Sequence, residues 1–80
     1  MPIRAYVFIQ TDPGKAKDVA GEVGAISGSP RLKASAITGR FDVLAEVEGN
    51  DLTSLANTVL TKISKVQGVR RTETAVVVWP

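Results

Sequence analysis

The sequence contains neither cysteine nor histidine. Without cysteine no disulfide can stabilise the fold, and without histidine a zinc site would have to rest on carboxylates alone. A nucleophilic side chain would also lack its usual activating base. We therefore expect no metal, no cofactor and no catalytic centre, so that the protein is not an enzyme.

Long apolar runs and strong charge imbalance are missing as well. No segment approaches the roughly 20 apolar residues of a membrane helix. Ten Lys and Arg residues oppose eight Asp and Glu residues, and the longest basic run is Arg70-Arg71. Surfaces that bind nucleic acid usually carry a basic stripe, which these scattered charges do not supply. We expect a cytoplasmic protein that makes no direct contact with membrane or nucleic acid.

The chain is short for a protein that folds alone. Its 80 residues form a single domain, 1–80, close to the size at which one hydrophobic core gives only a thin stability margin. Because disulfides and structural zinc are excluded, oligomerisation is the remaining common means of stabilisation. The composition therefore predicts a homo-oligomer.

Apolar periodicity divides the chain into six elements. Alternating apolar residues and β-branched content predict four strands, over 3–10, 31–38, 41–48 and 69–79. Apolar spacings of three and four predict two helices, one between an Asp12 N-cap with Pro13 in the first turn and a Gly28 C-cap, the other between Asp51 and Gly68. This order predicts a ferredoxin-like α+β fold, β-α-β-β-α-β, with a four-stranded antiparallel sheet and both helices on one face.

The sheet face without helices is predicted to be apolar. We assign Phe41 to the helix side, together with the alternating residues Ile3, Ala5, Val7, Ile9, Val43, Ala45 and Val47. The opposite face then carries Tyr6, Phe8, Leu44 and Ile37, and the last strand adds either Val76 and Val78 or Ala75 and Val77. An open face in water should be polar, so large apolar groups there indicate an interface. We predict a face-to-face dimer, and its interface residues are Tyr6, Phe8, Leu44, Val76 and Val78.

Two polar stretches are candidates for a binding site. The first is the hairpin Thr38-Gly39-Arg40-Phe41-Asp42, and the second is Arg70-Arg71-Thr72-Glu73-Thr74 in the last strand. Together with the helix over 51–66 and Gly68-Val69, these stretches resemble the ligand-binding domain of the leucine-responsive/asparagine regulator (Lrp/AsnC) family, also called the regulation-of-amino-acid-metabolism domain. The resemblance spans nearly the whole chain.

The resemblance implies face-to-face dimers, rings of dimers such as octamers, and amino-acid effectors bound between dimers. The residues it assigns to ligand binding are Thr38, Gly39, Arg40, Phe41, Asp42, Thr72 and Thr74. Physical chemistry agrees, since glycine lets a carboxylate approach backbone N–H groups and Asp42 can bind an ammonium group. Arg40 either favours an acidic effector side chain or faces solvent.

Full-length members of the family carry an N-terminal helix-turn-helix, whereas this sequence starts at the first strand. The resemblance therefore implies a stand-alone module that modulates transcription or amino-acid metabolism, one route being co-assembly with a full-length Lrp/AsnC regulator. Two alternatives remain, a small dimeric enzyme of the cofactor-free monooxygenase type and a purely structural assembly subunit. The absence of histidine and the few aromatic residues argue against the enzyme.

Overall fold

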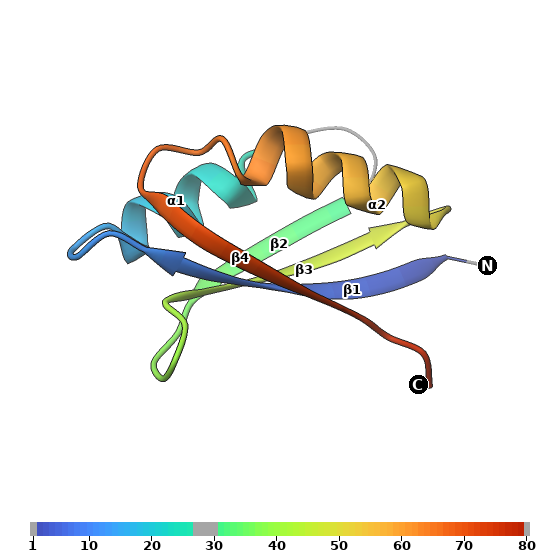
Figure 1. Cartoon of the computed structure of the whole chain (residues 1–80), viewed down its shortest axis with the longest axis horizontal. Helices are drawn as coiled ribbons and strands as arrows, with labels where there is room; N and C mark the ends of the chain where they lie inside the picture. Colours follow the sequence, from blue (N-terminus) through green and yellow to red (C-terminus); the bar gives the residue numbers. More distant parts are fainter. Residues whose placement is uncertain (1, 27–30, 80) are drawn as a thin grey trace.

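The computed structural model describes residues 2–26 and 31–79 (Figure 1). Its elements in chain order are β1 (Ile3–Thr11), α1 (Ala16–Gly24), β2 (Arg31–Ala36), β3 (Val43–Gly49), α2 (Leu52–Thr58), a π-helical turn η1 (Val59–Ile63) and β4 (Val69–Val76). The strands form one antiparallel sheet in the order β2-β3-β1-β4. Both helices cover the same face of this sheet (Figure 1). The predicted ferredoxin-like α+β fold is confirmed.

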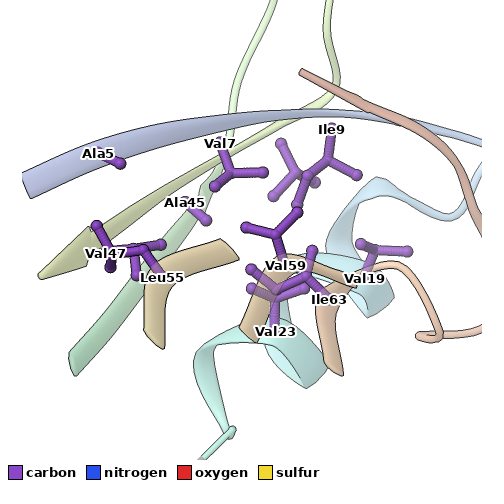
Figure 2. Close-up of a cluster of buried hydrophobic side chains, with 11 residues drawn as sticks. Ala5, Val7, Ile9, Val19, Val23, Ala45, Val47, Leu55, Val59 and Ile63 are labelled. Carbon is purple, nitrogen blue, oxygen red and sulfur yellow. The ribbon is translucent and has the colours of Figure 1, made fainter. Parts of the chain in front are cut away.

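The hydrophobic core lies between the sheet and the helices. Alternate residues of β1 and β3 are buried there, because successive side chains of a strand point to opposite faces. Figure 2 shows these strand side chains directed toward those of α1, α2 and η1. The core consists of Ala5, Val7, Ile9, Val19, Val23, Val43, Ala45, Val47, Leu55, Val59 and Ile63. We call the other side of the sheet the open face.

Helix α1 begins later than the sequence predicts, at Ala16 instead of directly after Asp12. Gly14 adopts a φ of +77°, and the Lys15 N–H donates to the Asp12 carbonyl oxygen over 3.1 Å, so Pro13-Gly14 form a turn. Asp12 is therefore not an N-cap. Its N–H donates to the Gly68 carbonyl oxygen at 2.8 Å, which ties the end of β1 to the start of β4. The expected C-cap Gly28 lies outside the described residues.

The second helix starts where the sequence predicts. The Asp51 carboxylate accepts a hydrogen bond from the Ser54 N–H at 2.7 Å, which is the geometry of an N-cap. The helix then widens in η1, where the Ser64 N–H donates to the Val59 carbonyl oxygen five residues back. Val59 and Ile63 stay in the core, while Leu60 is 68% exposed. Neither helix in the described part of the chain combines the length and apolar character needed to cross a membrane.

Gly68 occupies the tight connection from η1 to β4. Its φ of +99° lies in a region that L side chains rarely adopt. A Cβ atom at this position would lie 3.1 Å from Val19 Cγ2 and 3.3 Å from Lys15 Cβ. Both the backbone conformation and the close approach to α1 therefore favour glycine at this position.

Candidate functional site

The loop between β2 and β3 projects beyond the sheet on the side away from the helices (Figure 1). The Ile37 N–H closes the loop by donating to the Asp42 carbonyl oxygen at 2.9 Å. Gly39 has a φ of +121°, and a Cβ atom there would meet nothing within 4 Å. Thr38, Gly39 and Arg40 are all exposed, so the predicted binding loop is open to ligands in solution.

Asp42 fixes this loop to the end of β1. Its N–H donates to the Ile9 carbonyl oxygen at 3.0 Å, and its Oδ2 accepts from the Thr11 N–H at 2.8 Å. The carboxylate thus continues the β1–β3 hydrogen bonding where the main chain of the loop has already turned away. A carboxylate has about four lone-pair sites, so Asp42 can accept further hydrogen bonds from a ligand.

Replacing Asp42 by alanine should destabilise the protein even without ligand. Thr11 is buried, so Asp42→Ala leaves its N–H without an acceptor, at a cost of about 1–3 kcal/mol. Chemical denaturation measures this loss directly. Arg40→Ala is the matched control, because Arg40 is exposed in the same loop, and it should leave the midpoint unchanged. Equal midpoints for Asp42→Ala and the unmodified protein would contradict a structural role for the carboxylate.

Phe41 lies on the open face, contrary to the prediction that it faces the helices. Its ring centroid is 5.4 Å from that of Phe8, and the Arg71 Cζ atom lies 5.8 Å above the Phe41 ring. The chain bends at Asp42, before β3 begins, so the alternation of β3 does not extend to Phe41. Arg71 was not expected beside the hairpin. The sequence does carry one indication of this position. Arg71 and Glu73 are two residues apart, so their side chains lie on the same face of β4.

The structure does not bring the two predicted threonines together with the hairpin. Thr72 pairs with Ile9 and Thr74 pairs with Val7, so both point to the helix side of β4. Strand β1 separates them from β3 and from Asp42. Within one chain, the hairpin and these threonines are therefore two separate surfaces.

The three predicted interface residues of β1 and β3 point away from the helices. Tyr6, Phe8 and Leu44 are half-buried and alternate with fully buried core residues. Phe8 and Leu44 stand opposite one another in the β1–β3 register, so their side chains are neighbours on the open face. An apolar centre on the open face is thus present, and its role in dimerisation stays a prediction.

The facing assigned to the last strand is wrong. Val76 pairs with Ala5 and so lies on the helix side, where it is 38% exposed. Ala75 pairs with Tyr6 on the open face, and Val77 continues that pairing, since its N–H donates to the Arg4 carbonyl oxygen. Val78 follows the end of β4 and is 91% exposed. Because every residue of the run 75–79 is apolar, its sequence carries no alternation from which the facing could be inferred.

Val76 and Thr74 border an apolar groove of about 250 Å³ between β4 and α2. The groove residues are Leu52, Leu55, Ala56, Val59, Leu60, Thr74 and Val76. The groove contains no charged side chain that could bind an amino-acid head group. Among the described residues no three acidic side chains gather in the manner of metal ligands. The polar hairpin is therefore the better candidate for ligand binding.

Comparison with known proteins places these features in one family. The family model of the Lrp/AsnC ligand binding domain matches residues 4–78. A Pyrococcus abyssi protein named as an uncharacterized HTH-type transcriptional regulator is 31% identical over 74 residues, which cover 92% of this chain and 46% of that protein. The chain thus spans about half the length of this relative.

Solved structures agree on the fold. Escherichia coli AsnC superposes with a TM-score of 0.84 at 15% identity, covering 98% of this chain and 52% of AsnC. A transcriptional regulator of Neisseria meningitidis, solved as a complex with L-Met, gives a TM-score of 0.78 at 18% identity, covering 96% of this chain and 50% of that one. Because the family model matches residues 4–78, this chain belongs to the Lrp/AsnC ligand-binding domain family and is a regulatory domain.

Proposed function

We propose that this chain is an amino-acid-binding regulatory module that works as a face-to-face homodimer. Rings of such dimers, or joint assemblies with full-length Lrp/AsnC regulators, carry its effect to transcription or amino-acid metabolism. The observation that carries the proposal is the Thr38–Asp42 hairpin, which projects into solvent and is held at its base by Asp42. The L-Met complex of the Neisseria relative supports an amino acid as the ligand class.

The hairpin offers partners for both charged groups of a free amino acid. At Gly39 no side chain shields the backbone, so a carboxylate can approach main-chain N–H groups closely. The Asp42 carboxylate holds the loop through Oδ2, and Oδ1 can accept a charge-assisted hydrogen bond from the ammonium group. The hairpin thus combines uncharged main-chain N–H donors near Gly39 with the negative charge of the Asp42 carboxylate.

A neighbouring subunit completes the proposed site. Thr72 and Thr74 lie across β1 from the hairpin of their own chain, so they cannot close over a ligand bound to that hairpin. A hairpin contributed by one subunit and threonines contributed by another would enclose it from two sides. Ligand binding and assembly are coupled in this arrangement, because the ligand stabilises the contact that forms its site.

The apolar centre of the open face supports the dimer. Tyr6, Phe8 and Leu44 are only half-buried in the single chain. Completing the burial of a side chain of this size contributes up to about 1.5–3 kcal/mol. A two-fold interface uses the same patch on both subunits, so each contribution counts twice.

A panel of free amino acids tests the proposal on a sample whose mass is known from light scattering. At least one amino acid at millimolar concentration should raise the melting temperature and give a calorimetric binding isotherm. The same amino acid should shift the mass distribution toward larger assemblies, since it binds between subunits. If no amino acid raises the melting temperature, effector binding is wrong.

Asp42→Asn separates the binding role of the carboxylate from its structural role. Asparagine keeps an oxygen that can accept from Thr11, but it removes the charge that attracts an ammonium group. We expect affinity for the amino acid found in the panel to fall by about 10-fold or more, the value of a charged hydrogen bond. Asp51→Asn is the control, because asparagine also caps helices and Asp51 lies outside the hairpin. Similar calorimetric affinities for the two variants would exclude Asp42 from the site.

A further inference from the structure

The open face is hollowed at the end where β1 begins. A hollow of about 520 Å³ lies there, bordered by β1, β2 and β3, and we call it the charged hollow. Its charged residues are Arg4, Lys33, Glu46 and Glu48, and Tyr6 stands beside them. Tyr6 and Lys33 both lie opposite Glu46 in the sheet register, which places them together on the open face.

The segment after β4 carries large apolar side chains that are exposed in the single chain. Val77 is still paired with Arg4, and beyond it the chain leaves the sheet on the side away from the helices (Figure 1). Val78 and Trp79 follow, and Trp79 is 88% exposed. Tryptophan is enriched among the side chains that anchor protein interfaces in fitted pockets.

Two-fold symmetry relates this segment to the charged hollow. The strand order puts β4 and β2 at opposite edges of the sheet. When two open faces meet about an axis that runs along the strands, the β4 edge of one copy lies over the β2 edge of the other, with like ends together. Trp79 and the charged hollow are at the same end of the sheet, since Arg4 borders the hollow and pairs with Val77, two residues before Trp79. The axis along the strands therefore places each Trp79 over the charged hollow of the other copy.

An axis across the strands gives a poorer fit. It would place Trp79 of the other copy over the far end of β4, near Arg71. There the Arg71 guanidinium already lies over the Phe41 ring, which in turn packs on Phe8. The Phe41 ring face is thus already covered by Arg71, whereas the other end of the open face offers the charged hollow.

We propose that the charged hollow receives Trp79 of a second copy of this chain and so sets the two-fold axis along the strands. The inference rests on the face-to-face dimer of the proposed function. The indole ring can stack on the cationic groups of Arg4 and Lys33, and its N–H can donate to Glu46 or Glu48. Each dimer contains two such contacts, which lie on either side of the axis and at the same end of it.

Intrinsic fluorescence tests whether Trp79 becomes buried. The sequence contains one tryptophan, so selective excitation reports on Trp79 alone. In a sample shown by light scattering to be dimeric, emission should be blue-shifted, and the acrylamide quenching constant should be severalfold smaller than in the unfolded chain. A dimer whose Trp79 is quenched like the unfolded chain overturns this contact alone. A monomer overturns the dimer of the proposed function and this contact with it.

Disulfide trapping tests where Trp79 lies. Because the sequence has no cysteine, each variant chain carries a single thiol, and the tag distinguishes the covalent heterodimer from the two homodimers by mass. A Trp79→Cys chain is equilibrated with a tagged Lys33→Cys chain, and in the control mixture with a tagged Glu73→Cys chain, Glu73 lying opposite Phe8 on the open face. Mild oxidation should give severalfold more covalent heterodimer with Lys33→Cys than with Glu73→Cys. Equal yields, or a preference for Glu73→Cys, overturn the proposed position and axis.

Discussion

Leu44→Glu is expected to convert the dimer into a monomer at micromolar concentration. Leu44 stands opposite Phe8 at the apolar centre of the open face. Because Leu44 is half-buried in the single chain, the substitution removes up to about 1.5–3 kcal/mol of apolar burial from each subunit, and two-fold symmetry counts the loss twice. Together with the cost of burying two carboxylates, this loss should raise the dissociation constant by about 100-fold or more. Light scattering over a dilution series measures it.

Leu60→Glu is the matched control for this experiment. It makes the same change at a leucine that is 68% exposed on η1, on the helix side of the sheet. Its mass should not fall below that of a dimer, and circular dichroism should show both variants folded. If Leu44→Glu stays dimeric while Leu60→Glu dissociates, the interface lies on the helix side and the proposed face-to-face arrangement is wrong.

Gly68→Ala should lower the free energy of unfolding by about 2–5 kcal/mol. A left-handed backbone conformation costs a residue with Cβ about 1–2 kcal/mol, and overpacking adds about 1–3 kcal/mol. Both apply, because φ is +99° and the new Cβ would press on Val19 and Lys15. For a domain of this size each kcal/mol lowers the melting temperature by about 4–8 °C. Thermal unfolding should show a decrease of at least about 8 °C.

Gly21→Ala makes the same chemical change with the opposite expected sign. Gly21 lies inside α1, and a Cβ atom there would meet nothing within 4 Å. Alanine in a helix interior is more stable than glycine by about 0.8–1 kcal/mol, so the melting temperature should rise. If the melting temperature fell by a similar amount in both variants, the backbone conformation at Gly68 would not be the cause of the destabilisation by Gly68→Ala.

The sequence predicts those parts of the fold in which one periodicity holds without interruption. Strands β1 and β3 alternate cleanly, and six of the residues predicted to face the helices are buried there, namely Ala5, Val7, Ile9, Val43, Ala45 and Val47. The predicted start of α1 fails because Pro13 suits a helix N-terminus and a turn equally well, and the positive φ of Gly14 selects the turn. Here and at Asp42, a single local bend, which has no periodic signature, decides the outcome.

The candidate site is harder to predict because its parts come from separate strands. The hairpin is recognisable from Gly39 and Asp42, which lie close in sequence. Arg71 reaches Phe41 only through the pairing of β1 with β4, and that register shifts between Gln10 and Thr11. No local pattern encodes such a shift. The same holds for the charged hollow, whose residues become neighbours only when three strands pair.

The π-helical turn of η1 makes the length of the second helix adjustable. Ser64 bonds to Val59 across one residue more than a regular α-helical turn contains. If the exposed Leu60 were deleted, that same N–H and carbonyl would be four residues apart and would form an ordinary α-helical bond. A helix with the π-helical turn and one with a regular α-helical turn therefore differ by a single-residue deletion in evolution. Alignments of relatives should tolerate a one-residue gap at this point while Leu55 and the core above it stay in register.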